Sequence, residues 1–151
     1  YNLSLMLKIV NKQYYYFLKK KYSSVKNVQF IPPVKMRQIP KKINKYDIGL
    51  ILGVPESENH LYSMPNKLFE YIQGRLCIIS NPLIDIKKFI IQYKVGYTSK
   101  LFNTDNVASL IKSLKANDIY KAKINSHYQA KQFNHKILFK DFDKLFKKVL
   151  S

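Results

Sequence analysis

Short apolar runs alternate with amphipathic segments along most of this chain, and this alternation constrains the fold more than any other feature. The apolar runs are five or six residues long, at Leu5–Val10, Asn27–Ile31, Asp47–Leu52, Leu76–Ser80 and Val95–Ser99. The segments between them, at 12–22, 36–46, 64–73 and 84–93, carry apolar residues three or four apart, as amphipathic helices do. Short strands that are apolar on both faces are typical of a parallel sheet covered by helices. The sequence therefore predicts an α/β domain built on a parallel sheet.

The last third of the chain is predicted to be helical. The segment 103–114 opens with Asn/Thr/Asp capping residues, and a second helical stretch covers 118–133. In the tail, 136–150, an apolar stripe faces lysines; it consists of Leu138, Phe142, Leu145 and Val149. We expect this terminal helix to pack on the core, and a helix lying on a membrane surface is the alternative. Nothing resembles a repeat or a linker, so residues 1–151 are expected to form a single domain.

The chain carries 27 Lys+Arg against 9 Asp+Glu, a formal net charge of +18. This charge favours an anionic partner, which is nucleic acid, a lipid headgroup surface or a phosphorylated substrate. A lysine-rich composition with no such partner would look the same. The lone cysteine, Cys77, lies in an apolar run, where burial is expected, and one thiol per chain suits a reducing cytoplasm. No apolar run is long enough to span a bilayer.

Ligands of open parallel sheets bind beyond the carboxyl ends of the strands. Two segments are predicted there, the turn at Ile31–Arg37 and the long polar loop that leads to the helix after the third strand. Ser63 is a competent N-cap for that helix, with Pro65 in its first turn. The free amides around Met64 to Lys67 would then form an anion-binding helix terminus.

Lys67 and Glu70 lie one turn apart on this helix, so both are predicted on one face. A lysine at a helix N-terminus suits a phosphate, and a carboxylate beside it suits paired ribose hydroxyls. The alternative is an exposed i,i+3 ion pair worth about 0.2–0.5 kcal/mol. On the opposite side Leu68, Phe69 and Ile72 are expected to face the sheet. Gly74 and Arg75, which close the helix, are expected to be structural.

The stretch PNKLFEYIQGRLCIIS, residues 65–80, resembles the motif of the C-terminal, nucleotide-sugar-binding domain of GT-B-fold bacterial glycosyltransferases. In that family a Pro-x-Lys-x-x-Glu helix precedes a glycine and a buried strand. The segments before and after it, NKYDIGLIL, NPLIDIKKFIIQYKVGYT and TDNVASLIKSL, follow the order usual in the family. The resemblance covers about Leu5 to Leu114. It implies a Rossmann-like parallel sheet flanked by helices, one half of a GT-B fold, followed by C-terminal helices.

The resemblance also implies residue roles. Glu70 would bind the donor ribose, and Lys67 with the amides around Pro65 and Asn66 would bind the diphosphate. The residues beside the donor sugar would be Asn59, Tyr62 and Ser63, and those beside the base Pro32, Pro33, Val34 and Arg37. Tyr62 stands where many retaining members carry a second glutamate, so a mechanism borrowed from that subgroup is in doubt. The strand and the cationic phosphate loop that usually open the domain are not found in the sequence, which would weaken donor binding.

The implied function is transfer of a hexosyl group from a nucleotide diphosphate sugar to a saccharide or lipid-linked acceptor, in capsule or lipopolysaccharide synthesis. The N-terminal acceptor domain is not found, so the chain is expected to be partial and inactive alone, with any general base supplied by that domain. No cofactor or metal is expected: the DFD at Asp141–Asp143 lies in the terminal helix, and His60, His127 and His135 lack metal-ligand spacing. His60 is a minor candidate for a catalytic role. A cytoplasmic location, or a peripheral one at the anionic inner face of the cell membrane, would follow.

Two other functions remain open at this point. A basic nucleic-acid-binding module would use the lysines for charge and the run Tyr14–Phe17 for stacking, although consecutive helical residues point about 100° apart. The resemblance to a glycosyltransferase argues against nucleic acid as the partner. A sugar-nucleotide epimerase would share the fold, but it should need His and acidic residues in the cleft that the sequence does not offer.

Overall fold

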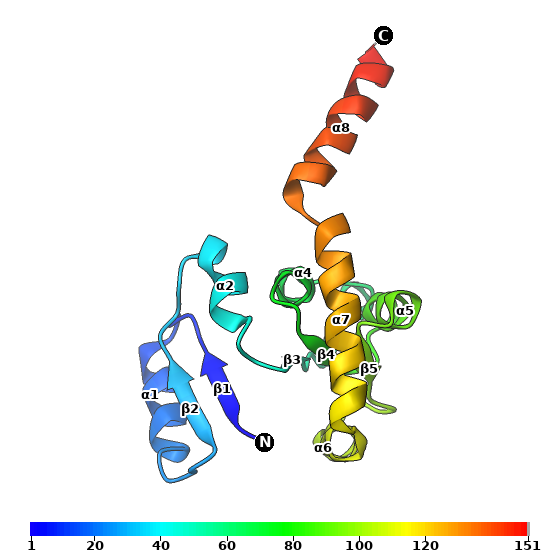
Figure 1. The fold of residues 1–151 in the computed structure, drawn as a ribbon. Coiled ribbons are helices and arrows are strands. Elements are labelled where there is room, and N and C mark those ends of the chain that lie inside the picture. Colours follow the sequence, from blue (N-terminus) through cyan, green and yellow to red (C-terminus); the bar gives the residue numbers. More distant parts are fainter. Residues whose placement is uncertain (151) are drawn as a thin grey trace. The chain divides into compact units, whose positions relative to one another are not determined.

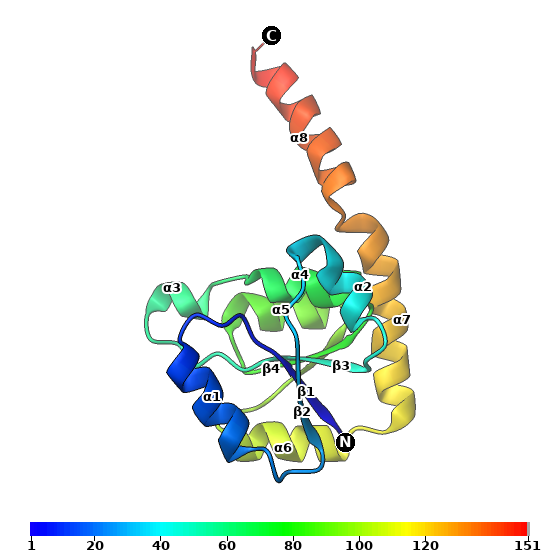
Figure 2. The ribbon, with the colours of Figure 1, turned by 90° about the vertical axis from the view of Figure 1, so that its left-hand side faces the viewer.

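The computed structural model describes residues 1–150 and, at residues 135, 136, 138, 140 and 141, the backbone only. The chain divides into two compact units, one covering Tyr1–Gln38 and the other beginning at Ile39 (Figures 1 and 2). Each unit holds its own parallel sheet: two strands in the first and three in the second. The predicted α/β architecture with parallel strands and flanking helices is therefore confirmed, with the strands hydrogen-bonded as two sheets.

The first unit is a strand–helix–strand element followed by a short turn of helix. β1 (Leu3–Met6) pairs in parallel with β2 (Val28–Ile31), and α1 (Lys12–Lys21) connects them; η1 (Met36–Gln38) follows. Asn11 caps α1, because its Oδ1 accepts a hydrogen bond from the Tyr14 amide at 2.9 Å. The first strand was expected at Leu5–Val10, which is wrong at both ends: β1 begins two residues earlier and ends four residues earlier. Pairing begins at Leu3, and Val10, 85% exposed, already belongs to the connection into α1.

The second unit is built on the sheet β3-β4-β5, in which all neighbours are parallel. Its strands are β3 (Ile48–Ile51), β4 (Cys77–Ser80) and β5 (Gly96–Thr98). The helices are α2 (Ile39–Ile43), α3 (Glu58–Leu61), α4 (Asn66–Gln73), α5 (Ile84–Tyr93), α6 (Thr104–Ser113), α7 (Ala116–Gln132) and α8 (His135–Leu150). In Figure 1, α4, α5 and α7 are drawn around this sheet. The predicted helix at 84–93 matches α5, and Asn103 caps α6 as expected, accepting from the Asn106 amide at 2.9 Å.

The core of the second unit lies on both sides of β4, whose four residues are all buried. The fully or nearly fully buried side chains include Leu68, Ile72, Ile78, Ile86, Ile90 and Val95. β5 packs close against β4 at Gly96, where a Cβ would collide with the Ile78 carbonyl oxygen. α7 is fixed along the sheet by the Ser126 hydroxyl, which donates to the Leu76 carbonyl at 2.7 Å, and by the Lys123–Asp47 ion pair at 2.7 Å. These contacts position the strand ends and the loops that follow them.

The expectation that the terminal helix packs on the core is wrong for this chain. On α8, Phe142, Leu145 and Val149 are 60%, 62% and 75% exposed; the side chain of Leu138 lies outside the described residues. β4 is already buried by the other elements packed on it, so this central strand does not need α8 as a cover. Among the described residues, no helix has the combination of length and apolar composition that crossing a bilayer requires.

Candidate functional site

The N-terminus of α4 is open. The helix begins at Asn66, and its N-cap is Pro65, whose side chain makes no capping hydrogen bond. Ser63 was expected to cap the helix, which is wrong: its hydroxyl donates instead to the His60 carbonyl at 3.0 Å and closes α3. The first amides of an α-helix have no partner within the helix, and a proline cap supplies no side-chain acceptor. The Leu68 amide donates to the Pro65 carbonyl at 2.9 Å, so the α4 terminus presents the N–H groups of Asn66 and Lys67 and the positive end of its dipole.

Lys67 and Glu70 follow this terminus without pairing to each other. The ion pairs among the described residues are Lys88–Asp85 and Lys123–Asp47, so the exposed Lys67–Glu70 pair considered as an alternative does not form. Lys67 is exposed, whereas Glu70 is half-buried. Burial raises the pKa of the Glu70 carboxyl, and the Lys67 charge partly opposes that rise. The carboxylate is therefore an unpaired acceptor in a partly desolvated position one turn behind a cationic helix terminus.

The buried side of α4 holds this arrangement in place. Leu68 and Ile72 are fully buried, and Phe69 packs against Phe89 with ring centroids 6.1 Å apart. These three contacts confirm the face that the sequence predicted. Tyr71 adds a contact that was not expected, because its hydroxyl donates to the Leu50 carbonyl on β3 at 3.2 Å. Because Phe69 and Tyr71, the residues on either side of Glu70, are both held by these contacts, the backbone at Glu70 is fixed.

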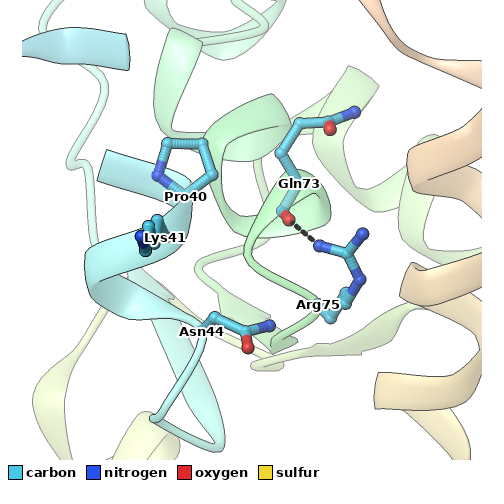
Figure 3. A pocket seen from close by; sticks show the side chains of 5 residues that line it. All are labelled: Pro40, Lys41, Asn44, Gln73 and Arg75. Atoms are coloured by element: carbon cyan, nitrogen blue, oxygen red, sulfur yellow. Dashed lines mark hydrogen bonds between the residues drawn. The ribbon is translucent and has the colours of Figure 1, made fainter. Parts of the chain in front are cut away.

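The opposite end of α4 is structural, as predicted for Gly74 and Arg75. A Cβ on Gly74 would lie 2.6 Å from Ile43, so glycine is required there for close packing; Arg75, at φ 60°, takes the left-handed conformation. A cavity of about 320 Å³ opens beside these residues, lined by Pro40, Lys41, Asn44, Gln73 and Arg75 (Figure 3). The Arg75 guanidinium donates to the Gln73 carbonyl at 2.6 Å within it. This cavity lies beside the entry to β4, away from the α4 N-terminus, so it is separate from the predicted site.

The loop between β3 and α4 gathers the residues expected beside the donor sugar. Asn59 lies on α3, Tyr62 ends that helix, and Ser63 follows, all within seven residues of Asn66. Asn59 and Tyr62 are exposed. His60, the minor catalytic candidate, accepts a hydrogen bond from the Glu56 amide through Nδ1 at 3.3 Å. This bond gives His60 a role in holding the loop.

The residues expected beside the base follow β2 in the first unit. Pro32, Pro33 and Val34 lead from the strand into η1, which contains Arg37. Pro32, Pro33 and Arg37 are exposed, and Val34 is half-buried. They succeed a strand of a parallel pair at its carboxyl end, as expected of ligand-binding loops. Their part in a site stays a prediction.

A buried polar cluster at the carboxyl ends of β4 and β5 was missed from the sequence. Asn81 and Ser99 are each 4% exposed; the Ser99 hydroxyl lies within hydrogen-bond distance of two acceptors, the Asn81 Oδ1 at 3.3 Å and the Leu101 carbonyl at 2.9 Å. The Asn81 amide group donates in turn to the Gly53 carbonyl at 3.2 Å. Gly53 is the second residue after β3, so this cluster fixes the start of the loop that leads to α4. The sequence signal for this cluster was the change from apolar to polar residues where the fourth and fifth apolar runs end.

Other side chains that could take part in catalysis or metal binding are buried or hydrogen-bonded within the fold. Burial raises the pKa of the Cys77 thiol to about 12, so this cysteine is not a ready nucleophile. His127 accepts a hydrogen bond from the Arg75 Nε at 3.2 Å. Among the residues described, no group of three His, Cys, Asp or Glu side chains could hold a metal ion. The side chains of His135 and Asp141 lie outside that description.

Comparison with known proteins gives a structural match and no sequence match. No protein-family model matches the chain, and a search of curated proteins finds no match. Among solved structures, the chain is similar to WaaG, a glycosyltransferase involved in lipopolysaccharide biosynthesis, with a TM-score of 0.59 at 13% sequence identity. The match covers 83% of this chain and 32% of the WaaG chain. The chain therefore has a glycosyltransferase-like fold and spans about a third of that protein's length.

Proposed function

We propose that this chain is the donor-binding part of a glycosyltransferase that uses a nucleotide diphosphate sugar. The observation that carries the proposal is the open, lysine-bearing N-terminus of α4 followed one turn later by the half-buried, unpaired Glu70. An anion and a pair of hydroxyls separated by one helical turn would be complementary to this arrangement. The glycosyltransferase-like fold supports the same conclusion.

The donor would bind with its diphosphate at the start of α4, next to Pro65, where the N–H groups of Asn66 and Lys67 and the Lys67 ammonium would meet it. Glu70 would accept hydrogen bonds from the ribose hydroxyls, and such bonds to an ionised acceptor are stronger than neutral ones. Asn59, Tyr62 and Ser63 would contact the sugar.

The chemistry assigned to this chain is stabilisation of the leaving diphosphate. As the bond from the sugar C1 to the diphosphate oxygen breaks, negative charge grows on that oxygen, and the α4 amides and Lys67 would stabilise it without a metal. The acceptor hydroxyl forms the new bond to C1. A further domain would bind the acceptor and supply any general base, so this chain alone is expected to bind the donor without turnover. The products proposed are surface polysaccharides such as lipopolysaccharide or capsule.

A panel of ligands tests the proposal. Ligand-observed NMR would compare nucleoside diphosphates, their sugar conjugates, the matching nucleosides and inorganic pyrophosphate. We expect at least one nucleoside diphosphate or its sugar conjugate to bind more tightly than its nucleoside and than pyrophosphate. The reason is that the proposed site contacts both the diphosphate and the ribose. Binding of no nucleotide, or of pyrophosphate as tightly as any nucleotide, would overturn it.

One observation favours a second candidate, nucleic-acid binding through α1. Tyr14 and Phe17 are 60% and 57% exposed and their rings stack at 6.3 Å, so these two share a face although the run is consecutive. The Lys21 ammonium lies 5.9 Å from the centre of the Phe17 ring. Salt-dependent retention on single-stranded DNA that is lost in Tyr14→Ala/Phe17→Ala would favour this candidate. Retention that those substitutions leave unchanged would reflect net charge alone.

A further inference from the structure

α8 exposes an unusually large amount of apolar surface for a helix of this chain. Seven large apolar side chains along its 16 residues are exposed: Ile137 41%, Phe139 71%, Phe142 60%, Leu145 62%, Phe146 54%, Val149 75% and Leu150 72%. In Figures 1 and 2 the helix continues beyond the end of α7. Scattered apolar side chains on a surface are ordinary, but a contiguous group of this size marks an interaction site.

Four members of this group form one face. Phe142, Leu145, Phe146 and Val149 follow one another at spacings of three, one and three residues, which places them on one side of a helix. The rings of Phe142 and Phe146 stack with centroids 6.0 Å apart. Lys144 and Lys147, both exposed, fall on the other side at 100° per residue. α8 is therefore amphipathic from Phe142 to Val149, and its apolar side there is exposed.

We propose that α8 binds the surface of an anionic phospholipid bilayer, lying along it with its phenylalanine-rich face in the headgroup region. Charge decides between a lipid surface and an uncharged apolar partner: α8 has five lysines against two aspartates, in a chain of net charge +18. Phe and Leu on one face with lysines on the other is the composition of helices that lie in the membrane interface. At 16 residues the helix is shorter than the roughly 20 that a bilayer crossing needs, and the proposed orientation is therefore along the surface. The inference is independent of the donor site.

A tryptophan introduced into this chain would report on one position alone, because the natural sequence contains none. Phe142→Trp would place a single fluorophore on the apolar face of α8, and Tyr120→Trp would place one at a 62% exposed position on α7. With vesicles of phosphatidylcholine and phosphatidylglycerol, the α8 reporter should shift to the blue and be quenched by brominated lipid, while the α7 reporter should not. Vesicles of phosphatidylcholine alone should give a much smaller response, and added salt should reduce it.

Some substitutions on α8 should weaken vesicle binding and one should strengthen it, which makes the test more specific. By vesicle sedimentation, Lys144→Gln and Lys147→Gln should each weaken binding to anionic vesicles about fivefold, and Leu145→Glu should abolish it. Asp143→Asn, which removes an exposed negative charge from α8, should strengthen binding. Circular dichroism of each variant would verify that the fold is kept, as expected for exposed positions.

Three outcomes would overturn the proposal. The first is the absence of vesicle binding at low salt by a folded chain. The second is binding that Leu145→Glu leaves unchanged, since the lysines of the whole chain would then suffice. The third is a blue shift of the α8 reporter that needs no lipid and grows with protein concentration, which would assign the apolar face to a second copy of the chain.

Discussion

Tyr71 of α4 lies directly across Gly49 of β3. A Cβ at Gly49 would stand 2.5 Å from Cδ2 of the Tyr71 ring, and the Tyr71 hydroxyl donates to Leu50 on the same strand. The helix that carries Lys67 and Glu70 is thereby held to the sheet by a contact that only glycine permits. The stability of the domain and the position of its candidate site depend on the same pair of residues.

Gly49→Ala should therefore lower the free energy of unfolding by about 1–3 kcal/mol, because the added methyl group displaces the Tyr71 ring. Thermal and urea unfolding would measure the change. Gly53→Ala is the matched control: its Cβ would meet Leu83 at an ordinary 3.7 Å, so a change within about 0.5 kcal/mol is expected. Equal losses in the two variants would show that the Tyr71 contact has no special role.

Glu70→Gln should make the domain more stable relative to wild type as pH rises. Burial raises the pKa of Glu70 in the folded state, so above its unfolded pKa the folded state binds more protons than the unfolded one. Wild-type stability then falls as pH rises through that window, whereas glutamine does not titrate. Unfolding midpoints at about pH 3.5 and about pH 7, on either side of the ordinary glutamate pKa, would measure the difference. An advantage of Glu70→Gln that is no larger at the higher pH would count against this burial.

Asn81→Ala should destabilise the domain by about 1–3 kcal/mol, because it removes a buried side chain together with its hydrogen bonds to the Ser99 hydroxyl and the Gly53 carbonyl. It should also increase amide hydrogen exchange in the loop that starts at Gly53. Asn117→Ala, at an exposed position of α7, is the control and should change neither quantity. Exchange that stays at the wild-type rate would mean that the loop is held by other contacts.

Lys67→Met should weaken nucleotide binding only through the phosphates. A charge at the α4 terminus contributes to diphosphate binding and not to nucleoside binding, so a nucleoside diphosphate should lose about fivefold to thirtyfold in affinity, the range of a charge-assisted hydrogen bond of about 1–2 kcal/mol. The matching nucleoside should bind as it does to wild type. Calorimetric titration of both ligands would separate them, and equal losses for the two would contradict the phosphate role.

The sequence predicted most of the secondary structure because local signals determine it. Apolar runs and capping residues such as Asn103 depend on near neighbours, and so does the inward face of α4 with Leu68 and Ile72. Contacts through space were harder to anticipate. Ser63 is a residue type that often caps helices. Its hydroxyl nevertheless donates to the His60 carbonyl, and Pro65 is the N-cap of α4.

The exposure of α8 and the cluster around Asn81 depend on tertiary arrangement. The stripe at Phe142 and Leu145 has the pattern of a core helix, and only the structure shows that β4 is buried by other elements while this stripe is exposed. Asn81 and Ser99 are eighteen residues apart in sequence and meet because β4 and β5 are parallel neighbours. Of the candidate site, the α4 residues were predictable from spacing and resemblance, while the supports beneath them were not.

The central claim, that Glu70 binds the ribose of a nucleotide donor, is tested most directly by a double-mutant cycle between protein and ligand. The affinity of the tightest-binding nucleoside diphosphate and of its 2′-deoxy form would be measured for wild type and Glu70→Ala, with Asp105→Ala, at an exposed position of α6, as the control. Wild type and Asp105→Ala should prefer the ribose form by about tenfold or more, and Glu70→Ala should lose that preference. An equal preference for the ribose form in wild type and Glu70→Ala would contradict the claim.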